Sequence, residues 1–283
     1  MSEMHDVFSN EFLPVEKMQR LLLEGRSDYL TAKPFPHVVI DGLFNDDILS
    51  KILVEFQNQS DKNWIKFQNN REIKLALNQD EHLGLYTKLM LYHLNSAPFL
   101  YFLSAITGIQ NLIADSYFEG GGMHQIRPGG KLGVHTDFSH HPMTNLNRRL
   151  NALLYLNKGW TAEFGGELEL WNRDMSRCEK KISPIFNRLV IFGTTDFSYH
   201  GHPEPLNFPE GTTRKSLALY YFTNGRPSDE NSGKRETIFH DRPGERLYSN
   251  SEKMKELIVD WLPPVVTKAI LRIKSRTSNS SAE

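Results

Sequence analysis

The stretch Leu132-Gly-Val-His-Thr-Asp-Phe138 carries a histidine and a carboxylate two residues apart, His135 and Asp137. The run has the composition of a short strand, in which alternate side chains project from the same face. Two ligands from one strand and a third from elsewhere make the 2-His-1-carboxylate face that holds non-haem Fe(II) and leaves other positions open. Most HxD pairs are ordinary polar contacts, so the weight of this pair depends on the sequence that follows it.

A third ligand is available in Phe197-Ser-Tyr-His-Gly-His-Pro203, which has the pattern of a later short strand. His200 and His202 share one face of that strand, so either could complete the set. We prefer His200, because His202 directly precedes Pro203, where the ladder is expected to end.

An arginine begins the next apolar run, Arg214–Phe222, fourteen residues after His200. Arginine at the mouth of such a strand is costly unless its guanidinium finds a carboxylate. Taken alone, Arg214 is equally well read as a strand-end residue in solvent. Beside a metal site, it fits a bidentate clamp on an acid cosubstrate. Alternation places Ser216, Ala218 and Tyr220 on the face of Arg214.

Composition limits the class of protein. Among 283 residues, 33 Lys and Arg nearly balance 34 Asp and Glu, so the global charge gives no reason to expect a nucleic-acid partner. The one cysteine, Cys178, excludes a disulfide within the chain and favours a reducing compartment. The polar, acidic N-terminus is unlike a signal peptide, and no apolar run is long enough to cross a bilayer. We therefore expect a cytoplasmic protein.

The chain divides into three parts by pattern. Residues 1–114 are expected to form a support layer of helices and a strand, 115–225 a core of short strands belonging to the same domain, and 226–283 a loop or lid, an amphipathic helix and a disordered tail. Helical spacing predicts helices at 15–24, from about 46, at 83–94 and at 98–106, with a strand at 34–41 and a polar loop at 57–70. Strands are predicted at 123–127, 133–137, 150–156, 167–171, 188–192, 198–200 and 217–222.

The C-terminal part, 252–276, is amphipathic but is broken by two prolines. Its second half carries an apolar stripe beside a basic one. It fits a helix packed on the body with solvated lysines, or a helix that contacts a membrane surface or a partner. No oligomeric state is predicted.

Six motifs in order resemble a known family. They are His135-x-Asp137, the run 151–160 (NALLYLNKGW), the run 165–171 (GGELELW), the run 187–192 (NRLVIF), His200, and the run 214–221 (RKSLALYY). Over about residues 115–225 the chain resembles the 2-oxoglutarate/Fe(II) dioxygenases of the prolyl-4-hydroxylase-like branch. The resemblance implies a mainly β, α+β fold: a distorted double-stranded β-helix (jelly roll, cupin-like) with N-terminal helices packed on the major sheet.

The resemblance also implies a site. His135, Asp137 and His200 would bind iron, Arg214 would bind the distal carboxylate of 2-oxoglutarate, and Tyr155 would donate a hydrogen bond to that carboxylate. Tyr155 could equally be a core aromatic. The implied cofactors are Fe(II), 2-oxoglutarate and O2, with ascorbate as an accessory reductant. The implied reaction is hydroxylation of an unactivated C–H bond with release of succinate and CO2.

The substrate is not predicted beyond its class. Prolyl hydroxylases often carry a tyrosine before Pro-Gly, where this chain has Arg127, and this departure argues against a prolyl substrate. Arg127, with Gln125 on the same face, is a candidate contact for an anionic substrate; a salt bridge or a solvent role is the alternative. A peptidyl residue, a free amino acid and another small molecule all stay open.

Two other functions compete with the oxygenase. The first is a non-catalytic jelly-roll module that binds a metal or a small acid. It is disfavoured because the iron and cosubstrate residues are all present. The second is a zinc hydrolase, disfavoured because no further acid or base accompanies the three ligands.

Overall fold

The second half of the chain is built from short antiparallel strands, as the alternating pattern predicts. The computed structural model describes residues 11–58, 60–209, 211–227, 230 and 233–245, and residues up to Pro243 belong to one unit. The later strands are β4 (Ile113–Ala114), β5 (Gly122–Ile126), β6 (Lys131–Thr136), β7 (Asn147–Tyr155), β8 (Leu168–Trp171), β9 (Cys178–Ile182), β10 (Arg188–Gly193), β11 (His200–His202), β12 (Arg214–Thr223) and β13 (Ile238–Phe239).

The N-terminal part supplies the helices and three further strands. These are α2 (Val15–Thr31), β1 (His37–Asp41), α3 (Asp46–Asn58), β2 (Ile65–Gln68), β3 (Glu72–Leu77), α4 (Leu85–Leu94) and α5 (Ala97–Thr107). The strands form one antiparallel sheet in the order β1-β10-β7-β12-β5-β3-β6-β11-β8-β9. The fold is therefore mainly β with a few helices.

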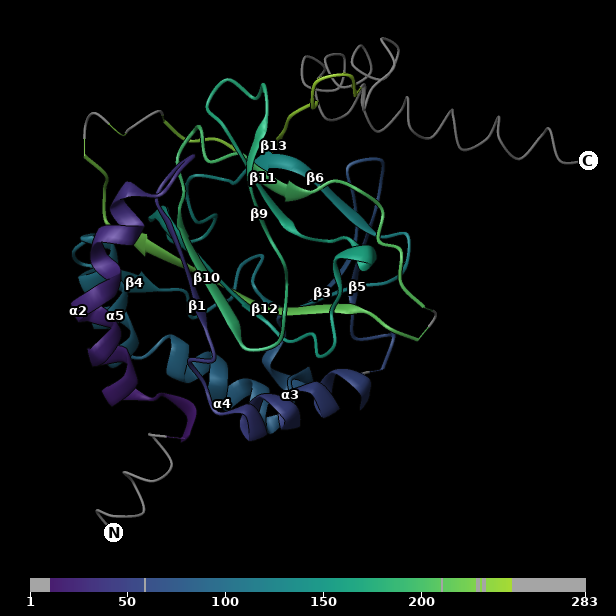
Figure 1. Cartoon of the computed structure of the whole chain (residues 1–283). Coiled ribbons are helices and arrows are strands. Elements are labelled where there is room, and N and C mark those ends of the chain that lie inside the picture. The colour runs from purple at the N-terminus through teal and green to yellow at the C-terminus, as the bar shows by residue number, and fades with distance from the viewer. Residues whose placement is uncertain (1–10, 59, 210, 228–229, 231–232, 246–283) are drawn as a thin grey trace, which may run out of the picture. The chain divides into compact units, whose positions relative to one another are not determined.

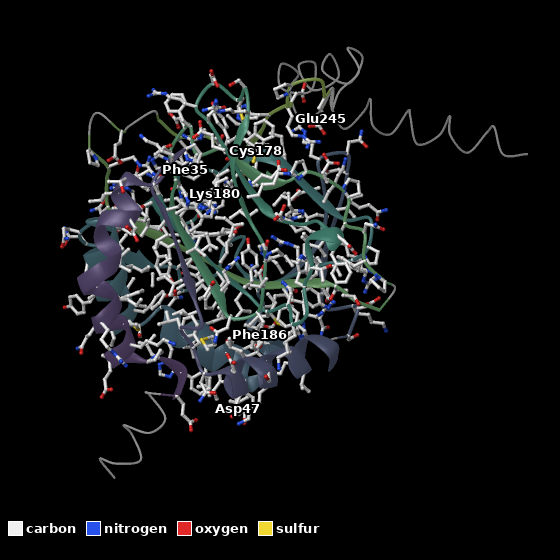
Figure 2. The ribbon with its side chains drawn as sticks, in the orientation of Figure 1. Phe35, Asp47, Cys178, Lys180, Phe186 and Glu245 are labelled. Carbon is white, nitrogen blue, oxygen red and sulfur yellow. The ribbon has the colours of Figure 1, made fainter. Side chains whose placement is uncertain are left out.

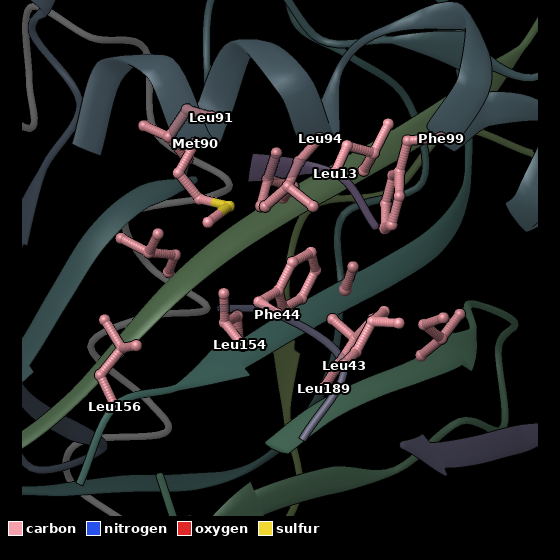
Figure 3. Close-up of a cluster of buried hydrophobic side chains, with 14 of the residues drawn as sticks. Leu13, Leu43, Phe44, Met90, Leu91, Leu94, Phe99, Leu154, Leu156 and Leu189 are labelled. Carbon is pink, nitrogen blue, oxygen red and sulfur yellow. The ribbon is translucent and has the colours of Figure 1, made fainter. Parts of the chain in front are cut away.

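Alternation along the long central strands separates a helix-covered face from a second face. On β7, Leu150, Ala152 and Leu154 are buried with residues of α3, α4 and α5. Figure 3 shows Leu154 in this cluster, together with Met90 and other apolar side chains. On the opposite face, Tyr155 packs with a separate apolar group that includes residues of β8 and β10. Because successive side chains of a strand change sides, this second face carries the polar residues of the same strands.

The helices form where apolar residues recur at helical spacing. On α3, Ile48, Leu49 and Ile52 are fully buried, and the helix begins after Asn45, whose side-chain oxygen accepts a hydrogen bond from the amide of Asp47 (2.8 Å). α5 ends at Gly108, which has a left-handed backbone conformation (φ 77°). α2 packs beside α5, and α3 beside α4 (Figure 1).

The prediction of a polar loop over 57–70 was wrong. α3 continues to Asn58, and β2 pairs with β3 in a hairpin that the sequence pattern did not indicate. The reason is that β2 lies at an edge, where three of its four residues are exposed, so it lacks the alternation of a half-buried strand. β9 was missed for a related reason: its charged middle residues are exposed, and its side chains include Cys178 and Lys180 (Figure 2).

No single helix in the described part of the chain has the length and apolar character to cross a membrane; α4 and α5 together, bent by 50°, meet that criterion by length and composition only. Several of their residues belong to the core cluster that the strands line. The predicted amphipathic helix at 265–276 and the tail lie outside the described residues.

Candidate active site

Two strands bring the HxD pair and a later histidine together. His135 on β6 pairs in register with His200 on β11, and their ring centroids are 4.4 Å apart. Asp137 directly follows β6, and its two carboxylate oxygens lie 3.7 Å from His135 Nε2 and 3.6 Å from His200 Nε2. All three side chains are buried, and their ligand atoms lie within 4.8 Å of one another. The strands approach closely because Gly201 leaves room: a Cβ there would lie 2.7 Å from the carbonyl oxygen of Gly133.

Hydrogen bonds fix the orientation of both imidazoles. His135 Nδ1 donates to the carbonyl oxygen of Gly133 (2.9 Å), and His200 Nδ1 donates to that of Ser198 (2.8 Å). A carbonyl can only accept, so each Nδ1 carries the proton and each Nε2 presents a lone pair towards Asp137. Burial lowers the pKa of His135 to about 3 and also lowers the pKa of His200, so both rings are neutral near pH 7. Metal-ligating histidines in proteins are typically held in this way, so both side chains are suited to bind a metal.

Asp137 is held as a carboxylate by neighbours that the sequence did not reveal. Burial alone would raise its pKa, but the Arg148 guanidinium and the two histidines outweigh burial, so the pKa lies well below its usual range. Arg148 lies 3.1 Å from one carboxylate oxygen, and Asn151 donates to the other (2.8 Å). Arg148 also donates to the Asn151 side-chain oxygen. These contacts orient the third ligand.

Arg148 is 1% exposed, the largest fully buried side chain in the described chain. Its guanidinium carbon lies 3.5 Å from the centroid of the Tyr220 ring and 4.4 Å from that of Phe138. In the sequence, the one indication of the role of Arg148 is that a cationic residue lies within a run that forms a buried strand. The partner, Asp137, is defined only by the tertiary fold.

Arg214 and Tyr155 form the second half of the site. Arg214 is 5% exposed; its Nε donates to the carbonyl oxygen of Gly166 (2.8 Å), and its Nη2 donates to the Tyr155 hydroxyl (3.3 Å). Burial lowers the pKa of Arg214 and raises that of Tyr155. Among the described residues, no carboxylate forms an ion pair with Arg214. A buried cation of this kind fits the carboxylate of a ligand.

One cavity of about 350 Å³ joins the two halves, since His135, Asp137, His200, Arg214 and Tyr155 all line it. The donor set fits the groups that the sequence implies. Two neutral imidazoles and a carboxylate suit Fe(II), and an arginine with a phenol suits the far end of a dicarboxylate such as 2-oxoglutarate.

The structure places the two predicted substrate residues elsewhere. Gln125 donates to the Thr213 hydroxyl (2.9 Å), and Arg127, half exposed, forms an ion pair with Asp61. Neither lines the cavity, because the residues of β5 that face it are His124 and Ile126. Neither residue is therefore placed to contact a substrate bound beside the metal ligands.

One wall of the cavity is formed by residues that were not predicted from the sequence to be part of the site. Ile65 and Phe67 of β2, Lys74 of β3 and Phe239 of β13 line it. Lys74 Nζ forms an ion pair with Glu72 (3.0 Å) and lies 4.8 Å from the Phe67 ring centroid. β2 and β3 were not predicted as strands, so their part in the site had no signal. The segments that follow β6 and β12 contribute Phe138, Thr237 and Phe239 to the lining of the cavity.

The structure agrees with the choice of His200 over His202. β11 ends at His202, directly before Pro203, as the sequence predicted. The register adds a second reason, because His200 lies opposite His135 while His202 lies opposite Leu132. The three ligand atoms that converge are those of His135, Asp137 and His200.

Comparisons with known proteins agree with this geometry. Residues 121–222 match the family model described as the 2OG-Fe(II) oxygenase superfamily. Over 79 residues the chain is 32% identical to mouse (Mus musculus) prolyl 3-hydroxylase OGFOD1, a match that covers 26% of this chain and 14% of that protein. The chain thus spans a small part of the length of this curated relative.

Two solved structures share the fold. A prolyl hydroxylase from Trichoplax adhaerens, in complex with a hypoxia inducible factor peptide fragment, has a TM-score of 0.53 at 19% identity and covers 74% of this chain and 92% of its own. A prolyl-4-hydroxylase from Pseudomonas putida has a TM-score of 0.52 at 17% identity and covers 72% and 99%. Residues 121–222 thus match the 2OG-Fe(II) oxygenase superfamily, the three residues that could hold a metal converge within or directly beside the matched strands, and the fold is shared with prolyl hydroxylases.

Proposed function

We propose that the protein is a 2-oxoglutarate- and Fe(II)-dependent dioxygenase that hydroxylates an unactivated C–H bond. The observation that carries the proposal is the cavity in which the His135–Asp137–His200 cluster and the Arg214–Tyr155 pair face one ligand space. Fe(II) bound there with 2-oxoglutarate and O2 supplies the oxidation, in which the keto acid becomes succinate and CO2. The residues of the chain then have to bind the metal, orient the cosubstrate and exclude water.

Each residue has a role that follows from its contacts. His135, Asp137 and His200 bind the metal, with Nε2 of both imidazoles fixed by the Nδ1 hydrogen bonds. Arg148 and Asn151 keep Asp137 charged and in place. No proton transfer by a side chain is required, so the residues act by positioning.

The other end of the cavity holds the cosubstrate. Arg214 and Tyr155 bind its distal carboxylate, and the hydrogen bond from Arg214 Nε to Gly166 sets the direction of the guanidinium. Gly166 has to be glycine, because its φ is +71° and a Cβ would lie 2.5 Å from Leu206 and 3.1 Å from Arg214. Leu153 and Leu168 add apolar walls that limit water.

We further propose that the strands curl into a double-stranded β-helix. The sequence order of the sheet supports this: β5, β12, β7 and β10 are neighbours on one side, and β6, β11, β8 and β9 on the other. From β5 to β12, consecutive strands therefore alternate between the two groups, except that β8 and β9 pair with each other within one group, and such alternation is what a jelly roll requires.

For the substrate, we propose a residue within a peptide. The support is the fold shared with a hydroxylase whose structure contains a peptide, and the mouth that β2 and β3 give the cavity. Ile65 is 42% exposed and Phe67 lies beside it in the cavity wall, so an extended chain has apolar surface to contact. Arg127, which seemed to argue against a prolyl substrate, does not reach the cavity and therefore does not bear on the choice.

The protein reconstituted anaerobically with Fe(II) is expected to convert 2-oxoglutarate to succinate when O2 and a substrate are added. A screen should compare peptide libraries, including prolyl peptides, with free amino acids and other small molecules. The readouts are succinate release and a mass gain of one oxygen. Omission of Fe(II) or of O2 is the control, and each should stop both signals.

The same screen can contradict the proposal. If the protein binds iron but no substrate class elicits succinate, a binding module without catalysis is the better description. Turnover with free amino acids and none with peptides would overturn the peptide proposal while leaving the oxygenase intact.

A further inference from the structure

His202 is a buried polar side chain that the proposed chemistry does not yet use. It is 4% exposed and lines the same cavity as the metal ligands and Arg214. Its Nδ1 is buried and has no hydrogen-bond partner among the described residues. Buried polar atoms in proteins are nearly always hydrogen-bonded, so a side chain that lines a cavity and keeps one such atom without a partner is a candidate for contact with a ligand.

The other histidines of the cavity differ in this respect. His135 and His200 donate from Nδ1 to backbone carbonyls, and His124 Nε2 contacts the carbonyl oxygen of Gly120 (3.0 Å). The Nδ1 of His202 has no such partner, although its strand neighbour His200 does. No hydrogen bond from Nδ1 to the described residues therefore fixes the orientation of the His202 ring, and a ligand in the cavity can do so.

The strand register puts His202 at the Arg214 end of the cavity. Gly201 of β11 pairs with Glu169 of β8, so His202 is level with Leu168. Two residues before Leu168 is Gly166, whose carbonyl oxygen accepts from Arg214 Nε. His202 therefore lies on the side of His200 that is nearer to Arg214.

The guanidinium of Arg214 has more N–H donors than its hydrogen bonds within the protein use. Its bonds to Gly166 and Tyr155 use two of its five N–H groups. Within the described residues no carboxylate meets the other three. A ligand that satisfies both Arg214 and an imidazole N–H has to offer several acceptor oxygens, and a carboxylate does so.

We propose that His202 donates a hydrogen bond to the distal carboxylate of 2-oxoglutarate, beside Arg214 and Tyr155. This inference rests on the proposed function and adds a positioning residue to it. The histidine then contributes to the choice of a dicarboxylic keto acid over a shorter one, because only the longer acid reaches it.

The test compares two keto acids that share the metal-binding end. The protein is loaded with Mn(II), which permits binding without turnover, and titrated calorimetrically with 2-oxoglutarate and with 2-oxobutyrate, which lacks the distal carboxylate. His202→Leu is expected to weaken 2-oxoglutarate binding about 10- to 100-fold, the usual effect of a lost hydrogen bond to a charged group. Binding of 2-oxobutyrate should change by less than about twofold, within the uncertainty of so small a difference.

Two further variants separate this role from a structural one. His202→Asn keeps an N–H near the position of Nδ1 and should recover most of the lost affinity. His37→Leu removes a buried strand histidine whose Nδ1 already bonds to Phe35 and which does not line the cavity. It should leave the affinity for both acids unchanged.

Other outcomes would overturn the proposal. An equal loss for both keto acids would place His202 at the metal-binding end, and unchanged 2-oxoglutarate binding would remove it from the cosubstrate altogether. Failure of the wild-type Mn(II) protein to bind 2-oxoglutarate would be a failure of the proposed function itself, and the inference would fall with it. The wild-type titration therefore distinguishes the two.

Discussion

Replacing His200 by alanine is expected to lower the affinity of the site for Fe(II) or Mn(II) by at least about 100-fold, since even residues that only support a ligand cost 10- to 100-fold when lost. Turnover of 2-oxoglutarate should disappear with the metal. The physical reason is that His200 Nε2 is one of three ligand atoms within 4.8 Å of one another. Metal affinity is measured by titration of the metal-free protein, and turnover by succinate release.

The chain provides a matched control two residues away. His202→Ala removes an equally buried histidine from the same strand, and the affinity for metal alone should stay within about threefold of wild type, a difference below 1 kcal/mol. Unimpaired metal binding in the His200→Ala protein, with a large loss in the His202→Ala protein, would show that the ligand is His202. Circular dichroism should confirm that both variants are folded.

Replacing Arg214 by methionine should raise the KM for 2-oxoglutarate by about 100-fold or more, because a buried, bidentate, charge-assisted contact is lost. At saturating 2-oxoglutarate the kcat should fall much less, since the metal ligands are untouched. Arg214 has no ion-pair partner among the described residues, so its loss does not leave a protein carboxylate buried and unpaired. Steady-state kinetics with varied 2-oxoglutarate measures the effect.

Arg127→Met is the control for this change. Arg127 is an exposed arginine that pairs with Asp61 and does not line the cavity. Its replacement should leave the KM for 2-oxoglutarate unchanged. A normal KM in the Arg214 variant would contradict the assignment of the cosubstrate end of the cavity.

The parts of the fold that the sequence predicted are those in which burial alternates along the strand. β7 and β12 are each apolar towards the helices, and their residues at the other parity, such as Tyr155 and Arg214, face the cavity. The same alternation grouped Arg214 with Ser216 and Tyr220. The predicted helix over 98–106 ends close to where α5 ends, at Gly108, because glycine readily takes the left-handed conformation found there.

The parts that the sequence did not predict depend on tertiary pairing. β2 is an exposed edge strand, so nothing in its pattern distinguishes it from a loop. The neighbouring strands set which face of β5 meets the cavity, so nothing in the sequence indicated that Gln125 and Arg127 lie outside it. Arg148 supports Asp137 across a distance of eleven residues in the chain, and only the fold brings the two together.

The most direct test of the account is a crystal structure of the protein grown anaerobically with Mn(II) and 2-oxoglutarate. We expect the metal to be bound by Nε2 of His135, Nε2 of His200 and the carboxylate of Asp137, with the distal carboxylate of 2-oxoglutarate against Arg214. A metal bound at any other set of residues, or a 2-oxoglutarate whose distal carboxylate lies away from Arg214, would contradict it.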